Sequence, residues 1–298
     1  GVATCAKHAG SRAYIVLGEQ NSMIEHAMEL IRDNNTFNSM IITPEHAERI
    51  MRPTSVRVVV DTQRVGSLIA PKLLGLAGRV VVIDHHRRGA DHIDNPTLHF
   101  LEARASSTSE LVTELLQYFD ANIRPPALVC GTLLAGITID TKHFAFNVGS
   151  RTFEAAGYLR KNGAETSMVK QMFQDDMESF GDVATTVRSA EILTGGVALA
   201  SVGEEMNNAP LIAAKSADEL IGIKGIEAAF VLGRDGESIS VSGRSLGNIN
   251  VQLICERLGG GGHLTMAGAQ LTNMELDEAE AHVRTAIEHY MQEVQNTL

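Results

Sequence analysis

Short apolar runs alternate with helix-like segments along the first 150 residues. β-Branched runs at 56–60 and 79–83 have the length of buried strands, and a further strand is predicted at 13–17. Apolar residues also recur at helical spacing over 22–33 and 67–77. Strands that alternate with helices are typical of βαβ units, so this region is predicted to form a parallel sheet covered by helices.

Several sequence signals mark where helices begin. Thr43 precedes a proline and has the character of an N-cap. Ser107 is followed three residues later by Glu110, a capping-box pattern that predicts a helix extending to residue 119. Two consecutive prolines precede an apolar segment at 127–140, which is also predicted to be helical. Further helices are predicted at 151–160 and 164–176.

The chain changes character after about residue 175. Strands are predicted at 195–202, 228–233 and 238–242, and helices at 211–220 and 249–258. The simplest account has three parts. We predict a first domain over 1–150, a helical connector over 151–188 and a second α/β domain over 189–298.

Composition narrows the class of protein. The 298 residues are 44% hydrophobic and 20% charged, which is an ordinary mix for a globular chain. The net charge of −11 argues against binding to duplex DNA, because such binding neutralises many phosphates. The apolar runs are too short or too interrupted to cross a bilayer. Three widely separated cysteines indicate a reducing compartment, which favours the cytoplasm.

Polar side chains follow the two predicted strands at 56–60 and 79–83. Asp61 ends the first strand, and Asp84-His85-His86 ends the second. Since ligands of open parallel sheets bind beyond the carboxyl ends of the strands, these groups should meet at one edge. Carboxylate oxygens and imidazole nitrogens together suit a divalent transition metal such as Mn²⁺.

Each of these residues also has an ordinary structural explanation. A single aspartate at a strand end, such as Asp61, is more often a turn residue than a ligand. Asp140, which ends the apolar helix 127–140, is either a buried polar group with a partner or a third ligand. Two adjacent histidines directly after an aspartate on a buried strand are harder to explain without a metal or phosphate.

The second domain contains four consecutive glycines at 259–262, followed by His263. Glycines let the backbone approach a ligand closely and leave N–H groups to hold phosphate oxygens, although a glycine run is often a flexible linker. Arg244 ends a predicted strand, and its guanidinium could bind a phosphate or lie solvated at the surface.

Taken together, these residues resemble the DHH phosphoesterase family with its DHH-associated C-terminal domain. The resemblance implies an α/β protein, in which a parallel-sheet DHH domain is joined by a helical connector to a smaller α/β DHH-associated domain. Four segments resemble more narrowly the GdpP-type cyclic di-AMP phosphodiesterases: 106–110, 140–142, 149–156 and 242–251. That group hydrolyses cyclic di-AMP to linear pApA with two Mn²⁺ ions.

The resemblance also implies roles for individual residues. Asp61, His85 and Asp140 match metal ligands, with Asp61 bridging the two ions. His86 matches the histidine near the scissile phosphate, and Asp84 is expected to orient a histidine. The residues that match substrate-binding positions are Ser107, Thr108, Arg244, Gly261, Gly262 and His263.

The sequence departs from the family in one important respect. The first family motif, His-x-x-x-Asp-x-Asp, supplies three further metal ligands and is not found in this sequence. We therefore expect the chain to lack half of the two-metal site and to hydrolyse its substrate weakly. A smaller departure lies at 146–149. Relatives usually carry Arg-Thr before the glycine there, so this sequence has no match for an arginine that contacts substrate in them.

The resemblance further implies a bacterial protein that is anchored in the cell membrane only through segments outside this chain. The chain itself would be its cytoplasmic domain, and a homodimer is possible for it. Two other functions stay open: a nano-RNase or pAp phosphatase that acts on short linear oligonucleotides, and a catalytically inactive nucleotide-sensing module.

Overall fold

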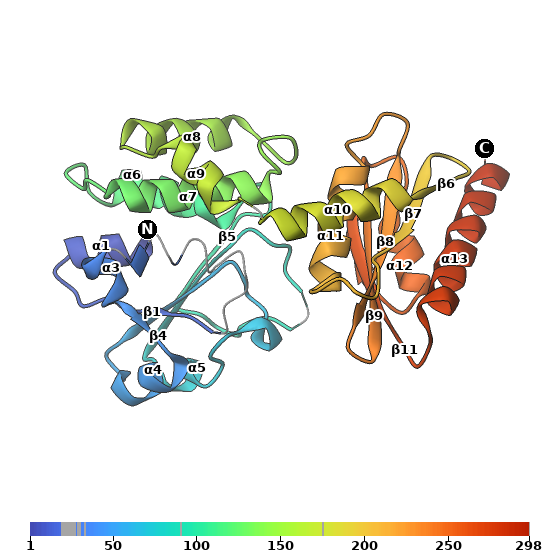
Figure 1. Cartoon of the computed structure of the whole chain (residues 1–298). Coiled ribbons are helices and arrows are strands. Elements are labelled where there is room, and N and C mark those ends of the chain that lie inside the picture. The colour runs from blue at the N-terminus through green and yellow to red at the C-terminus, as the bar shows by residue number, and fades with distance from the viewer. Residues whose placement is uncertain (19–27, 29–30, 33, 90, 175, 298) are drawn as a thin grey trace. The chain divides into compact units, whose positions relative to one another are not determined.

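The computed structural model describes residues 1–18, 28, 31–32, 34–89, 91–174 and 176–297. The chain divides into two compact units, Gly1–Gln174 (unit 1) and Asp175–Leu298 (unit 2) (Figure 1).

The strands described in unit 1 pair in parallel. β1 (Ile15–Val16) pairs with β2 (Ile41–Ile42), and a second sheet has the order β3 (Val56–Val60), β4 (Arg79–Asp84), β5 (Leu98–Leu101). Residues of β4 alternate between two apolar clusters, because Val82 packs with Val59 while Ile83 faces the helices. A sheet buried in this way matches the β-branched runs of the sequence.

Helices cover both sides of this sheet. The longer helices, α6 (Thr108–Phe119), α7 (Ala127–Asp140) and α8 (Ser150–Lys161), lie on one side, and Figure 1 shows α4 (Pro44–Ile50) and α5 (Leu73–Leu76) on the other. The remaining described helices of unit 1 are α1 (Val2–His8), α3 (Asn35–Asn38), the short 3-10 helix Val65–Ser67 and α9 (Thr166–Met172).

Helix α7 is apolar on all sides because its neighbours enclose it. It contacts α6, α8 and α9, and Cys130 and Ile137 are fully buried. Leu111 and Leu116 of α6 and Leu159 of α8 complete the same core. The predicted capping box begins α6 as expected, since the side chain of Ser107 accepts a hydrogen bond from the backbone N–H of Glu110.

The structure of unit 1 differs from the sequence-based prediction at residues 67–77 and at β5. The single helix predicted over 67–77 is wrong: the segment holds only the end of the 3-10 helix and α5, because Pro71 disfavours a helical conformation at the residue before it. The helix predicted over 22–33 lies mostly outside the described residues. Strand β5 follows an asparagine–proline pair, and its apolar and polar residues do not alternate clearly. The hydrophobic pattern therefore did not predict this strand.

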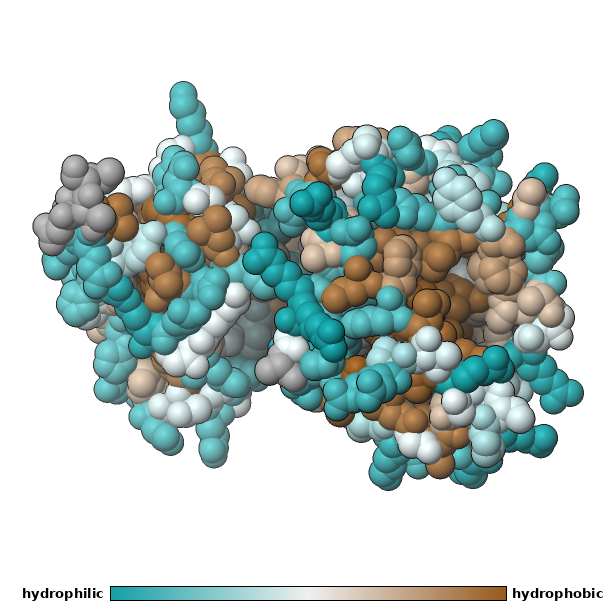
Figure 2. Space-filling view, turned by 180° about the vertical axis from the view of Figure 1, so that it is seen from behind, coloured by the Kyte–Doolittle hydropathy of each residue, from teal (hydrophilic) through white to brown (hydrophobic). Residues whose placement is uncertain are grey.

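Part of the surface of unit 1 is apolar. On the face turned to the viewer in Figure 2, apolar side chains gather in a hollow of this unit. Its exposed large apolar residues include Val56 and Val60, which are the two ends of β3.

Unit 2 contains one mixed sheet of six strands in the order β10-β11-β9-β8-β7-β6. Only β7 (Val197–Ser201) and β8 (Ala228–Asp235) pair in parallel. The other neighbours pair antiparallel. β6 (Glu191–Leu193) pairs with β7, and β9 (Ser238–Ser245) pairs with β8 and β11 (Met266–Thr272). β10 (Gly261–Gly262) pairs with β11.

Two helical layers enclose this sheet. α10 (Met177–Ser189) and α11 (Ala209–Leu220) pack on one face, and α12 (Val251–Arg257) and α13 (Leu276–Thr297) pack on the other. The central strand β8 serves both cores: Phe230 and Leu232 face α12 and α13, whereas Ala229 and Val231 face α10 and α11. A strand buried on both faces reads as a continuous apolar run, which is how the sequence revealed it.

The α/β class predicted from the sequence is confirmed. Helices α8 and α9 belong to the core of unit 1, and α10 packs in unit 2, so the segment 151–188 contributes to both units. The domain boundaries at 150 and 188 stay predictions. Among the described residues, the helices lack the combination of length and apolar character that a bilayer crossing requires.

Candidate metal centre

Asp61 lies directly after β3 in an unusual backbone conformation. Its φ of 64° is in the left-handed region, which aspartate tolerates better than most residues other than glycine. Its backbone N–H donates to the carbonyl oxygen of Ile83 on β4 at 3.0 Å. The main chain therefore sets the direction of this half-exposed carboxylate.

His85 brings the predicted ligands together. Its Nε2 atom is 3.6 Å from Oδ1 of Asp61 and 3.8 Å from Oδ2 of Asp140, the last residue of α7. The possible ligand atoms of Asp61, His85 and His86 also lie within 4.8 Å of one another. Three elements that are far apart in the sequence thus bring two carboxylates to the ring of His85, and the ring of His86 lies beside Asp61 and His85.

The other ring nitrogen of His85 fixes the tautomer. Nδ1 is 3.3 Å from the carbonyl oxygen of Ala105. Because a carbonyl can only accept, Nδ1 must carry the hydrogen, and Nε2 keeps a free lone pair that points to the two carboxylates. This is the arrangement in which an imidazole ligates a metal.

The electrostatics of the centre favour a cation. Burial, together with the charge of Asp61, raises the pKa of Asp140 to about 6. Two carboxylates this close to one another repel, and a positive ion between them would relieve the repulsion. Carboxylate oxygens with imidazole nitrogens suit Mn²⁺ or a similar transition metal, so the residues present fit such an ion.

Asp84 does not face this centre but orients His86. It is fully buried, and its Oδ1 accepts from Nδ1 of His86 at 2.8 Å and from the backbone N–H of His86 at 3.2 Å. The hydrogen bond to Asp84 leaves Nε2 of His86 for another partner.

Gln63 was not singled out by the sequence analysis. Its side chain is buried, and its Nε2 group donates to Oδ2 of Asp84 at 3.2 Å and to the carbonyl oxygen of His86 at 3.0 Å. The only hint in the sequence was a polar residue two positions after Asp61. A glutamine in that position is ordinarily a solvated loop residue.

Ser107 and Thr108 lie at the start of α6 and are both buried. The hydroxyl of Ser107 accepts from the backbone N–H of Glu110 at 3.0 Å, so this group is already used as a helix cap. The Thr108 hydroxyl makes no hydrogen bond within the part of the chain that the structure describes. The loop that precedes them contains Ala105, the partner of His85.

In unit 2, Arg244 is engaged in an ion pair. Its side chain is mostly buried, and its Nε donates to Oδ1 of Asp218 at 3.0 Å. A second donor group, Nη1, binds the carbonyl oxygen of Gly243 at 3.0 Å. The solvated-surface alternative for Arg244 is therefore wrong.

The glycine run is part of the sheet rather than an open loop. Gly261 and Gly262 form β10, and a Cβ at Gly262 would lie 2.5 Å from the carbonyl oxygen of Met266. At Gly260 a Cβ would come within 2.0 Å of the carbonyl oxygen of Gly268. The flexible-linker alternative is wrong, because close packing on β11 requires glycine here.

Fewer backbone N–H groups are free in this run than we expected. The N–H of Gly260 donates to the carbonyl oxygen of Cys255 at 2.9 Å, and the N–H of His263 donates to that of Met266 at 2.7 Å. The side chain of His263 is exposed at the turn between β10 and β11.

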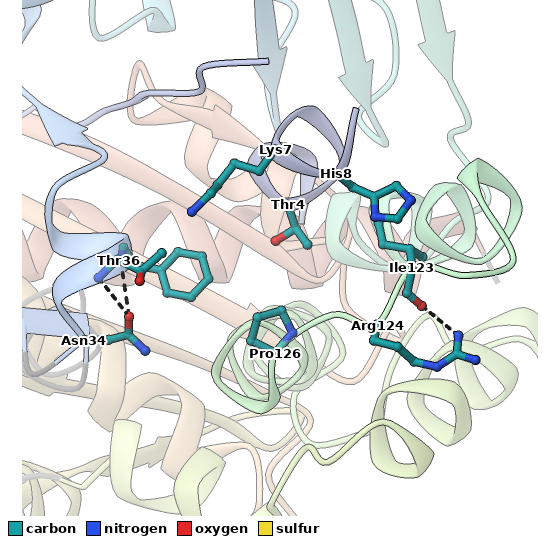
Figure 3. Close-up of a pocket in the computed structure, with 9 residues that line it drawn as sticks. Thr4, Lys7, His8, Asn34, Thr36, Ile123, Arg124 and Pro126 are labelled. Atoms are coloured by element: carbon teal, nitrogen blue, oxygen red, sulfur yellow. Dashed lines mark hydrogen bonds between the residues drawn. The ribbon is translucent and has the colours of Figure 1, made fainter. Parts of the chain in front are cut away.

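A pocket of about 380 Å³ lies elsewhere in unit 1 (Figure 3). Its described lining includes Lys7, His8 and Arg124 but none of the predicted site residues. Figure 3 shows the guanidinium of Arg124 turned toward the main chain, where Nη1 donates to the carbonyl oxygen of Ile123 at 3.0 Å. His8 is paired with Asp120 at 2.9 Å.

Comparisons with known proteins identify the family of this chain. The family model of the DHH family, N-terminal domain, matches residues 8–137, and that of the DHHA1 domain matches residues 194–293. The chain is a DHH-family protein. The match covers both units, and it confirms the resemblance stated from the sequence.

Two of the most similar curated relatives of this DHH-family protein share one printed activity. It is 43% identical over 252 residues to the cyclic-di-AMP phosphodiesterase GdpP of Geobacillus thermodenitrificans, which is 84% of this chain and 38% of that protein. It is 39% identical over 293 residues to the cyclic-di-AMP phosphodiesterase PdeA of Listeria monocytogenes. That match covers 97% of this chain and 45% of that protein. The chain thus spans less than half the length of these relatives.

A more distant relative has another printed activity. The bifunctional oligoribonuclease and PAP phosphatase NrnA of Thermus thermophilus is 28% identical over 222 residues, which is 70% of this chain and 64% of that protein. Among solved structures, an exopolyphosphatase-related protein from Bacteroides fragilis superposes with a TM-score of 0.82 at 17% identity, covering 98% of this chain and 87% of that chain. This similarity supports the fold alone.

Proposed function

We propose that the chain is the hydrolytic part of a metal-dependent phosphodiesterase that converts cyclic di-AMP to pApA. The observation that supports this proposal best is the position of His85 Nε2, within 4 Å of Asp61 and Asp140. Its second support is the identity of 43% and 39% to two proteins with that printed activity.

In this proposal, each residue of the centre has a separate task. Asp61, His85 and Asp140 hold a divalent cation, which we propose to be Mn²⁺, with two ions in a complete site. A cation bound there neutralises phosphate charge and supplies an activated water. In its doubly protonated form, His86 donates through Nε2 to the phosphoryl oxygens as charge develops on them, while its Nδ1–H stays on Asp84.

We further propose that six residues bind the substrate. They are Ser107, Thr108, Arg244, Gly261, Gly262 and His263. The support is uneven. The Thr108 hydroxyl is buried and has no hydrogen-bond partner among the described residues, and the His263 side chain is exposed. Arg244 would have to exchange Asp218 for a phosphate.

Action on short linear oligonucleotides is the second candidate, because NrnA is also a relative. A nucleotide-sensing module without activity is the third. The three candidates differ in measurable ways, since a sensor binds nucleotide without turnover and an oligoribonuclease prefers pApA or pAp.

The test is hydrolysis of cyclic di-AMP, pApA and pAp by the purified chain with and without Mn²⁺, together with its metal content. We expect Mn²⁺-dependent turnover of cyclic di-AMP that is weak in this chain, because the described ligand set is small for two ions. Preference for pAp would favour the second candidate, and tight binding without turnover or metal would favour the third. Membrane anchoring of a longer protein, a cytoplasmic location and a homodimer all stay predictions.

A further inference from the structure

Glu110 is a buried carboxylate that the proposed reaction does not use. It is 1% exposed, and three donors converge on its Oε2 atom. The hydroxyl of Ser106 lies at 2.6 Å, the backbone N–H of Ser106 at 3.2 Å and the hydroxyl of Thr152 at 2.7 Å. A carboxylate buried at this depth with three donors is a strong anchor for the segments that supply them.

Those segments meet at the loop between β5 and α6. Ser106 follows Ala105, whose carbonyl oxygen accepts from Nδ1 of His85 at 3.3 Å. Thr152 belongs to α8, and its hydroxyl also accepts from the backbone N–H of Gly149 at 3.0 Å. The carboxylate of Glu110 thus ties α8 and the loop to the first turn of α6.

The Ala105 carbonyl and the Ser106 N–H belong to one peptide unit, so the direction of one fixes that of the other. Because the peptide is planar, the N–H of Ser106 and the carbonyl of Ala105 point in opposite directions from the same plane. Holding the Ser106 N–H on Glu110 therefore aims the Ala105 carbonyl at His85.

We propose that Glu110 is a positioning residue, which fixes His85 in the Nδ1–H tautomer by holding the peptide between Ala105 and Ser106. The inference rests on the proposed function, since the tautomer matters only if Nε2 of His85 ligates a metal. Glu110 itself touches neither substrate nor cation in this proposal.

The test measures the tautomer directly, by ¹⁵N NMR of the ring nitrogens in the metal-free full chain labelled at histidine. At about pH 8, free imidazole is neutral, and its protonated and unprotonated nitrogens have separate shifts. The chain has 11 histidines, so His85→Gln identifies the signal. We expect the Nδ1–H form of His85 in the parent chain and a mixture of tautomers in Glu110→Ala.

Two further variants and one control separate positioning from stability. Glu110→Gln keeps an acceptor oxygen and should restore the parent tautomer. Glu110→Asp keeps the charge but shortens the side chain by one methylene, which withdraws the carboxylate from the backbone N–H of Ser106, so it gives a readout even if Glu110→Ala does not fold. Leu116→Ala opens a cavity in the same helix at a comparable cost in stability and should leave the His85 signal unchanged.

Binding of Mn²⁺ alone gives the second readout. We expect Glu110→Ala to weaken it about 10-fold or more, as is typical when the partner of a metal-binding histidine is lost. An unchanged single tautomer in folded Glu110→Ala or Glu110→Asp, or an equal change in Leu116→Ala, would overturn the inference. Neither readout includes hydrolysis, so a chain that fails to cleave cyclic di-AMP overturns the proposed function alone.

Discussion

The candidate site residues of the two units differ in whether they already have partners. In unit 1, His85 faces Asp61 and Asp140 at distances longer than direct hydrogen bonds, and an ion between them would improve the contacts. In unit 2, Arg244 is neutralised by Asp218, and the glycines pair with β11. The first unit is organised around something it could bind, whereas the second already satisfies most of its own polar groups.

This difference shows how far residue types alone indicate function. Carboxylates that crowd around one imidazole repel each other unless a positive partner lies between them, so such a cluster points to a cation. Glycine has an alternative explanation in close backbone packing, and that explanation accounts for Gly260 and Gly262.

The largest effect is expected at Asp61. Asp61→Asn removes one charge but tolerates the left-handed backbone, so the fold should be unaffected. Mn²⁺ binding and hydrolysis should fall by more than about 100-fold, because losing a ligand costs more than losing its outer partner. Calorimetry with Mn²⁺ and the hydrolysis assay measure both. Asp94→Asn, at an exposed aspartate of the same unit, is the control, and equal losses in both variants would remove Asp61 from the centre.

The glycine run allows a matched pair of variants in unit 2. Gly262→Ala should lower the free energy of unfolding by about 2 kcal/mol in urea, because its Cβ collides with the Met266 carbonyl and its φ is +148°. At Gly261 a Cβ meets no atom within 4 Å, so Gly261→Ala should be neutral. If Gly261→Ala nevertheless weakens pApA binding, the run binds ligand; if stability falls equally in both variants, the packing explanation fails.

A smaller effect is expected when Arg244 is released. Asp218→Asn removes the partner of this guanidinium, and a phosphate should then bind about two- to five-fold tighter, which corresponds to the usual strength of such a pair. Titration with pApA measures the change. Glu204→Gln, which weakens the ion pair of Arg234 instead, should leave the affinity unchanged. Weaker binding in Asp218→Asn would contradict a phosphate-binding role for Arg244.

The smallest difference concerns the thiols of the two units. Burial raises the pKa of Cys255 in unit 2 to about 12, so at pH 8 only about one thiol in ten thousand is ionised. Cys5 in unit 1 is partly exposed, and burial raises its pKa as well. Mass spectrometry after brief alkylation should find Cys5 modified first. Faster modification of Cys255 in the folded chain would show that its core opens.

The sequence was most informative where one signal dominated the local structure. The β-branched runs revealed β3 and β4, and the capping box at Ser107 gave the start of α6. The convergence of Asp61 and His85 followed from the rule that parallel strands end at the same edge of a sheet.

The remaining features depend on contacts between distant segments. Gln63 is an ordinary loop residue in sequence, and only the fold brings it to Asp84. The hydrogen bond from Thr152 to Glu110 connects residues 42 positions apart. Pattern and propensity describe neighbours in the chain, so neither could have indicated these pairs.

The conformation of Asp61 has a consequence for ion capture. Its carboxylate is aimed by a main-chain turn whose cost, of the order of 1–2 kcal/mol, is met during folding. An ion bound as we propose would not have to order this turn, and less ordering entropy would be lost on association. The proposed centre would therefore gain affinity from a backbone conformation that folding has already fixed.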